Sequence, residues 1–241
     1  MPTYRDDAVV LRTYPLGEAD RIVVLLTRTN GKVRAVARGI RRTSSKFGGR
    51  LEPGNHVDAQ LAVGRGSLDV VAQLAGRHEF DFAAHYPTFT AAQVLLEGAD
   101  RFVSEDKVPA LQQYRLLLGA LLALSRAEIG TELIVDSYLL RGLAIGGYGM
   151  ALSSCAACGI ALDEGWFAPQ LGGLVCDRSK PPAAAWVDAE LTAHLRTLLA
   201  GQWEALTADG SVQRRGSGIV AAFAQWQLER GLRSLEHLVR G

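Results

Sequence analysis

Three cysteines form the clearest candidate for metal chemistry in this sequence. Cys155 and Cys158 make a Cys-x-x-Cys pair, and Cys176 follows 18 positions after Cys158. A structural zinc site usually has four Cys or His ligands, so a second pair would place the fourth ligand at position 179. Ser179 occupies that position, and serine is a poor zinc ligand. Asp177 could supply an oxygen, but a residue adjacent to the ligand Cys176 rarely reaches the same metal ion. The pattern predicts partial zinc binding at Cys155, Cys158 and Cys176, and a metal-free loop held by packing is the alternative.

The sequence contains none of the catalytic motifs that we sought. It lacks a His-Glu-x-x-His pair, a phosphate-binding loop ending in Gly-Lys-Ser/Thr, and a Gly-x-Ser-x-Gly turn. Its histidines, His56, His78, His85, His194 and His237, are scattered along the chain. We therefore predict a protein that is not an enzyme. A metalloenzyme that uses the cysteine segment is an alternative from another class.

A run of like charges lies near the N-terminus, although 26 Lys and Arg against 25 Asp and Glu leave a net charge of only +1. Residues 28–50 contain eight basic and no acidic side chains. Because like charges this close repel one another, they favour a polyanionic partner such as nucleic acid. The predicted DNA-binding cations are Arg28, Lys32, Arg34, Arg38, Arg41, Arg42, Lys46 and Arg50.

Phe47 is the aromatic residue of this cationic run. It lies between Lys46 and Arg50, and a mixture of aromatic and basic side chains suits a single strand, whose bases stack while its phosphates meet cations. Phe47 is therefore included in the predicted DNA-binding set. The alternative is that its ring caps the core of the domain.

Five segments of the first 80 residues are typical of short strands: residues 8–14, 21–27, 32–38, 56–63 and 68–74. Asn30-Gly31 predicts a hairpin between the second and third. In the third, Lys32, Arg34 and Arg38 share the outer face, and Val33, Ala35 and Ala37 share the inner one. In the fifth, alternation predicts an inner face of Leu68, Val70, Ala72 and Leu74. Because short strands need protected edges, we predict a closed five-stranded oligonucleotide-binding (OB) barrel.

The rest of the chain changes to helical periodicity. We predict helices over residues 89–103, in the segment from 111 to 122, over 132–145 and over 188–200, and a last helix capped by Ser217. The predicted fold class is α+β and multi-domain. An OB-fold DNA-binding domain (1–80) precedes a helical domain (81–150 and 187–241), which carries a small zinc-knuckle-like cysteine insertion (151–186).

The apolar segments are too short to span a membrane. No apolar run approaches the roughly 18 residues that a spanning helix requires. The polar N-terminus lacks the pattern of a signal peptide, so we expect a cytoplasmic protein.

The first 55 residues carry a set of linked motifs. They are Gly17-Glu-Ala-Asp20-Arg21-Ile-Val, Gly31-Lys32, Ala35-Val-Ala-Arg38-Gly39-Ile-Arg41-Arg42 and Ser45-Lys-Phe47-Gly48-Gly49-Arg50-Leu-Glu52-Pro53. This set closely resembles the N-terminal barrel of the bacterial RecO family, and a weaker resemblance extends over the whole chain.

The resemblance implies a non-enzymatic DNA repair and recombination mediator of the RecF pathway. Such a protein binds single- and double-stranded DNA, anneals complementary strands and works with RecR. It contacts the C-terminal tail of single-strand DNA-binding protein (SSB), helps load RecA onto SSB-coated DNA, and acts at the nucleoid. Relatives often carry four cysteines in the insertion, so Ser179 departs from the pattern. An interaction scaffold whose barrel binds proteins is the alternative function.

Overall fold

The computed structural model describes residues 2–41, 45, 47–206, 210–228 and 233–238. The chain folds as two compact units, Met1–Ser125 and Arg126–Gly241. The predicted domain bounds concern which parts fold independently, and they remain a prediction. Within the described residues, no helix combines the length and the apolar character that crossing a membrane would require.

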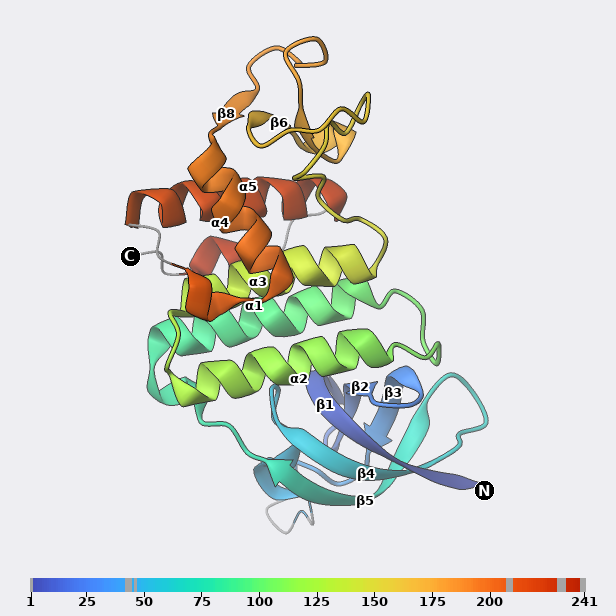
Figure 1. Cartoon of the computed structure of the whole chain (residues 1–241). Helices are drawn as coiled ribbons and strands as arrows, with labels where there is room; N and C mark the ends of the chain where they lie inside the picture. The colour runs from blue at the N-terminus through green and yellow to red at the C-terminus, as the bar shows by residue number, and fades with distance from the viewer. Residues whose placement is uncertain (1, 42–44, 46, 207–209, 229–232, 239–241) are drawn as a thin grey trace. The chain divides into compact units, whose positions relative to one another are not determined.

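The first unit contains a closed five-stranded barrel whose strands follow the order β1-β2-β3-β5-β4 (Figure 1). All pairings are antiparallel except the parallel contact of β3 with β5. This arrangement, together with helices and a cysteine cluster, confirms the predicted α+β class and its OB barrel. The strands are β1 (Thr3–Leu16), β2 (Asp20–Thr27), β3 (Gly31–Ala37), β4 (His56–Ala62) and β5 (Asp69–His78).

Alternation along the strands places apolar side chains inside the barrel. Val33, Ala35 and Ala37 of β3 are fully buried in the barrel core, as predicted. The predicted inner face of β5 is wrong in part. Gln60 pairs with Gln73 but Leu61 pairs with Val71, so Ala72 forms a bulge and Val71 packs inside instead of Val70.

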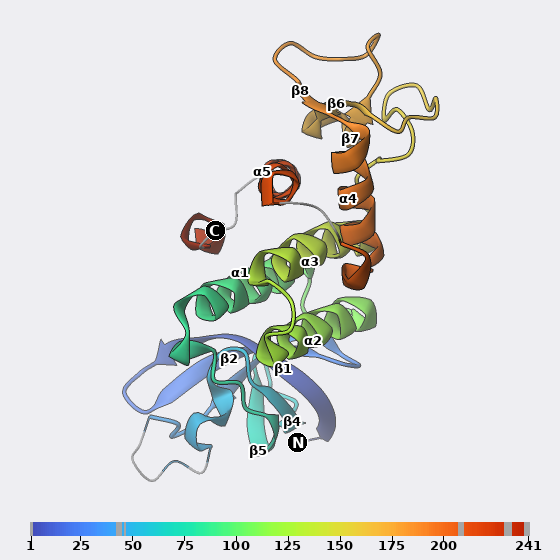
Figure 2. The same cartoon turned by 60° about the vertical axis from the view of Figure 1, so that its left-hand side comes forward.

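Two helices of the first unit, α1 (Tyr86–Phe102) and α2 (Leu111–Arg126), lie on the same side of the barrel (Figures 1 and 2). His56 of β4 connects the barrel to α2, because its Nε2 lies 2.9 Å from the Tyr114 hydroxyl. Burial is the main reason why the pKa of His56 is lowered and that of Tyr114 is raised to about 12.

The segment between these helices, residues 103–110, is here called the strap. Lys107 N–H donates to the Lys32 carbonyl at 2.7 Å, and Asp106 forms a parallel bridge with Lys32. The strap therefore covers the first part of β3. Gly31 allows this close approach, since a Cβ there would lie 1.7 Å from the carbonyl oxygen of Val108.

In the described part of the second unit, three α-helices accompany a small sheet in the order β7-β6-β8 (Figure 2). The predicted central helix is confirmed, because α3 is buried on nearly every side and packs against both α4 and α5. The elements are α3 (Thr131–Ile145), β6 (Gly165–Ala168), β7 (Gly173–Val175), β8 (Ala185–Val187), α4 (Ala189–Ala200) and α5 (Gly210–Gln227). Short 3-10 helices span Gly48–Leu51, Phe82–Ala84, Pro169–Leu171, Trp203–Ala205 and Arg233–His237.

Ser217 does not cap the last helix, so that prediction is wrong. The described part of α5 already includes Gly210, which places Ser217 inside the helix. Its buried hydroxyl donates to the Asp136 carboxylate of α3. Gly216 beside it lets α5 approach α4, since a Cβ on Gly216 would lie 2.9 Å from the ring of His194. The small residues at this point serve close helix packing rather than capping.

We expect Gly31→Ala to destabilise the barrel more than Gly17→Ala. Both glycines have positive φ, so both substitutions add the strain of a left-handed residue, about 1–2 kcal/mol. Only at Gly31 would the new methyl group meet the strap, which adds roughly 1–3 kcal/mol of overpacking. Hydrogen exchange followed by mass spectrometry on β3 and the strap measures the difference. Equal effects of the two substitutions would show that the strap does not pack against Gly31.

We expect the second unit to lose stability as the pH falls from 7 to 5.5. His194 is buried with neither ring nitrogen hydrogen-bonded within the described chain, and burial lowers its pKa. The unfolded state, with a histidine pKa near 6.5, therefore binds more protons, and stability falls by up to about 1.4 kcal/mol per pH unit.

Urea unfolding followed by tryptophan fluorescence reports on this unit, because Trp166, Trp186, Trp203 and Trp226 all belong to it. His194→Leu should flatten the pH dependence in this range, and the exposed His237→Gln is the control. If the stability of the His194→Leu variant depends on pH as strongly as that of the unchanged protein, another titrating group is responsible.

Candidate nucleic-acid interface and cysteine cluster

Lys32 is on the outer face of β3, as alternation predicts, but it is not exposed. Its Nζ lies 3.0 Å from the carbonyl oxygen of Asp100 and 3.3 Å from the Asp100 carboxylate, on α1. Arg12 also pairs with this carboxylate at 3.0 Å. The helix therefore covers Lys32 and neutralises its charge within the first unit.

Arg34 is exposed and also paired. Its Nε lies 2.6 Å from the carboxylate of Asp106 in the strap. The strap thus brings an acidic side chain to the strand that was predicted to present a row of cations.

The far end of β3 keeps exposed positive charge. Arg38 is exposed and has no ion-pair partner among the residues that the structure describes. Arg41 is also exposed, and its guanidinium donates to the carbonyl oxygen of Gly17 at 3.1 Å. Arg50 lies 3.8 Å from Glu79. The predicted residues Arg42 and Lys46 fall outside the described residues.

Phe47 lies in the core of the barrel. Its ring is only 2% exposed and packs in the same cluster as Leu51 and Val71. The structure therefore agrees with the alternative that Phe47 caps the core. Its ring does not offer a free face for stacking.

Arg28 lies in the turn between β2 and β3, beside two arginines that the sequence analysis missed. Arg5 on β1 and Arg77 on β5 belong to the same surface hollow as Arg28. Neither is part of the run between residues 28 and 50, because the barrel brings them together from distant strands. Alternation along β1 could have indicated Arg5, because Ala8 and Val10 point inward and an odd-numbered residue such as Arg5 then points outward.

The three cysteines lie together in the second unit, as their spacing predicts. Their sulfur atoms all lie within 4.8 Å of one another, and Cys158 and Cys176 are 3.8 Å apart. Sulfurs bound to one tetrahedral zinc at about 2.3 Å would be separated by roughly 3.8 Å. The cluster therefore fits three corners of a metal site, and these residues could bind a metal ion.

The backbone around the cluster favours a thiolate. Burial alone would raise the pKa of Cys155, but N–H groups of Cys176, Cys158 and Ala157 point at its sulfur and lower the pKa to about 6. The N–H of Ile160 would lower the pKa of Cys158, but the thiol of Cys155, burial and the thiol of Cys176 together outweigh it and raise this pKa. One thiolate among three sulfurs is a suitable start for binding a soft divalent cation.

Ser179 and Asp177 differ in their position at the cluster. The Ser179 hydroxyl lies 3.7 Å from the sulfur of Cys176, where a fourth ligand would be expected. Asp177 instead accepts a hydrogen bond from the indole of Trp166 at 2.8 Å. Asp177 is therefore engaged with Trp166 and Lys180, and the Ser179 hydroxyl lies beside the sulfur of Cys176.

Comparisons with known proteins agree with this architecture. Two family models match, "Recombination protein O N terminal" over residues 1–100 and "Recombination protein O C terminal" over residues 84–236. The DNA repair protein RecO of Cutibacterium acnes is 52% identical over 248 residues, covering all of both chains. RecO of Frankia casuarinae is 50% identical over 244 residues and RecO of Thermobifida fusca 46% over 245, again over both full lengths. This chain therefore belongs to the RecO family of DNA repair proteins.

Proposed function

We propose that this protein is a non-enzymatic recombination mediator of the RecF pathway that binds single- and double-stranded DNA and anneals complementary strands. The observation that carries the proposal is the pair of exposed guanidiniums, Arg38 and Arg41, at one end of an OB barrel. Guanidinium groups bind phosphates in a bidentate manner, and phosphate contacts carry no sequence information. Because Phe47 is buried, its ring adds no base stacking, and binding should tolerate any sequence.

Annealing follows from the same electrostatics. Two single strands repel each other through their phosphates, and a cationic surface that binds both lowers this repulsion. Arg28, Arg38, Arg41 and Arg50, together with Arg42 and Lys46, are the proposed contacts. Lys32 contributes least, since it is buried beside Asp100, and at Arg34 a phosphate would have to share the guanidinium with Asp106.

The proposed partners follow from membership of the family. We propose that the protein works with RecR, contacts the acidic C-terminal tail of SSB, and in this way promotes loading of RecA onto SSB-coated DNA. The proposed place of action is the nucleoid, in the cytoplasm. We also propose that the cluster of Cys155, Cys158 and Cys176 holds zinc at partial occupancy, which would tie together the loops that carry these residues.

We expect binding to a labelled oligothymidylate to weaken with salt, with a log–log slope of roughly −3 to −4, because about four to six phosphate contacts release about 0.7 counterion each. Arg38→Ala combined with Arg41→Ala should make the slope less steep by about 1.4 and lower the affinity roughly 10–30-fold near 0.1 M salt. Fluorescence anisotropy measures both quantities.

Arg178→Ala combined with Arg214→Ala, both exposed and in the second unit, is the control for the loss of two positive charges. Annealing of two complementary oligonucleotides should slow in the double variant at Arg38 and Arg41 and not in the control. A salt slope near zero, or unchanged annealing in the double variant, would remove the electrostatic basis of the proposal and favour a scaffold that binds proteins.

We expect the purified protein to contain clearly less than one zinc per chain. Three thiolates and a serine bind zinc more weakly than four thiolates. Ser179→Cys should raise the zinc content toward one per chain, and zinc should then raise the urea midpoint of the second unit, because metal binding to the folded form adds to its stability. Elemental analysis and tryptophan fluorescence check these outcomes.

Ser125→Cys, which adds an exposed thiol on α2, is the matched control and should not raise the zinc content. A full equivalent of zinc in the unchanged protein, retained after dialysis against a mild chelator, would contradict partial occupancy.

A further inference from the structure

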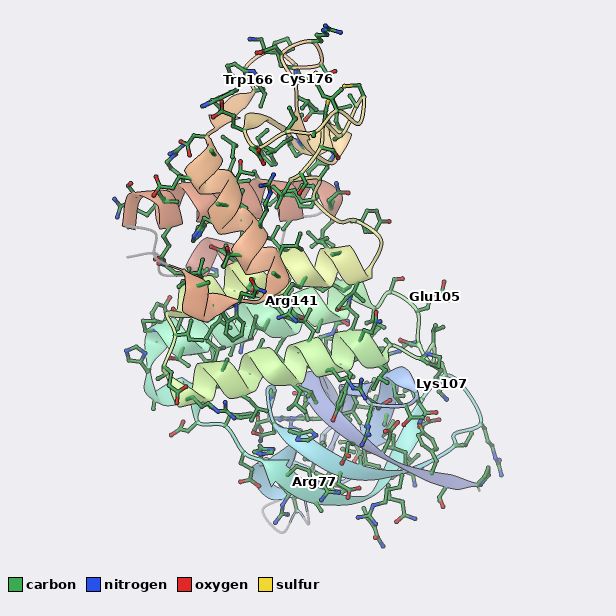
Figure 3. The ribbon with its side chains drawn as sticks, in the orientation of Figure 1. Arg77, Glu105, Lys107, Arg141, Trp166 and Cys176 are labelled. Atoms are coloured by element: carbon green, nitrogen blue, oxygen red, sulfur yellow. The ribbon has the colours of Figure 1, made fainter. Side chains whose placement is uncertain are left out.

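A hollow of about 560 Å³ lies on the outside of the barrel, where β1, β4 and β5 meet the turn between β2 and β3. Arg77, which lines it, is labelled in Figure 3. Its walls are charged almost throughout, with three arginines and three aspartates. The lining residues are Arg5, Asp6, Asp7, Arg28, Thr29, Asp58 and Arg77.

Two carboxylates at the base of the hollow face each other. Asp7 of β1 and Asp58 of β4 are directly paired across the two strands. Like charges in this position destabilise a sheet, so the pair requires compensation. Arg77 supplies it by donating to Asp7 at 3.2 Å and to Asp58 at 2.6 Å, and Arg5 adds two bonds to Asp58 at 2.6 and 2.7 Å.

These bonds fix the orientation of the two guanidinium groups. The Asp58 side chain is only 5% exposed, whereas those of Arg5 and Arg77 are 70% and 50% exposed. Asp58 thus holds the Nε–Nη2 edge of Arg5, and Asp7 and Asp58 together hold the same edge of Arg77, so the Nη1 group of each guanidinium lies outside these bonds. A planar fork held in this way matches a phosphate, with less side-chain entropy to lose on binding.

Asp6 has a different role, because it organises the turn that carries Arg28. Its carboxylate accepts hydrogen bonds from the N–H groups of Thr29 and Asn30 at 3.0 and 3.1 Å, and from the Asn30 amide at 2.8 Å. Arg28 is 57% exposed and lies 3.9 Å from Asp7. Three guanidiniums therefore face the hollow, and two carboxylates, Asp7 and Asp58, pair with them directly.

We propose that this hollow binds a phosphodiester group of a nucleic acid backbone, through Arg5, Arg28 and Arg77. The proposal rests on the proposed function and extends it to a second place on the barrel. Arg28 precedes β3 and Arg38 follows it, so the seven-residue strand separates the two cationic groups by roughly 20 Å. Two such places on one barrel let it hold two backbone segments at once, as annealing requires.

The test uses the full-length protein with Arg28→Ala and Arg5→Gln, alone and combined. In both variants Arg77 still joins Asp7 to Asp58, so the barrel should remain folded, which circular dichroism verifies. Each substitution should lower the affinity for a labelled oligothymidylate about 5-fold near 0.1 M salt and reduce the salt slope by about 0.7. Arg65→Ala, at an exposed arginine in the turn between β4 and β5, is the control and should change neither.

Arg77→Lys provides a variant that keeps the charge between the carboxylates but loses the planar fork. It should weaken binding while leaving the thermal midpoint close to that of the unchanged protein. A second probe replaces the phosphodiesters with uncharged methylphosphonates. With that probe, the differences among the variants should disappear, and differences that persist would overturn a phosphodiester contact.

The two levels of the proposal fail in different ways. If the unchanged protein binds the oligothymidylate and the variants at Arg5 and Arg28 bind equally well, while loss of Arg38 and Arg41 weakens binding, the hollow is not a phosphate site and the proposed function stands. If the unchanged protein binds no oligonucleotide, both are overturned.

Discussion

The closure of the barrel depends on the carboxylate of Asp69. β3 and β5 pair through only two residues on each strand, Ala35 with Asp69 and Val36 with Val70. At this point the fully buried Asp69 accepts hydrogen bonds from the Tyr4 hydroxyl at 2.6 Å and Lys107 at 2.9 Å. Burial alone would raise the pKa of Asp69, but these donors and the N–H of Gly64 lower it. A buried, satisfied charge here ties β1, β5 and the strap into one structure.

The same closure decides which cations the barrel presents to a polyanion. Because the strap is held by Asp69 through Lys107, Asp106 lies beside β3 and pairs with Arg34. Lys32 is then covered by Asp100 of α1. The cations of β3 itself are therefore paired with acidic groups, and the guanidiniums proposed to contact DNA lie before and after the strand. In this barrel the positions of acidic residues, more than the number of basic ones, decide which cations we propose as phosphate contacts.

Features set by local sequence patterns could be predicted from the sequence, and features set by contacts between distant residues could not. Alternation of apolar and polar residues predicted the barrel strands, because only every second side chain of such a strand points into the core. Val33, Ala35 and Ala37 show this pattern. The prediction failed at β5. There a bulge at Ala72 changes which residues point inward, and the residue types around it do not indicate a bulge. The pairing of Lys32 with Asp100 joins positions 68 residues apart, which charge counting along the chain does not detect. The cysteine cluster was predictable because a Cys-x-x-Cys pair followed by a further cysteine is a familiar spacing for a metal site.

Acidic neighbours also set the strength of the proposed contacts with DNA. Seven described arginines of the first unit pair with a carboxylate: Arg5, Arg12, Arg21, Arg28, Arg34, Arg50 and Arg77. A phosphate that approaches such a guanidinium shares it with, or displaces, an anion that is already bound. An exposed ion pair contributes only about 0–1 kcal/mol. Replacing its carboxylate by a phosphate therefore changes the free energy of the system only slightly. We propose that exchangeable contacts of this kind let the barrel release strands after they have paired.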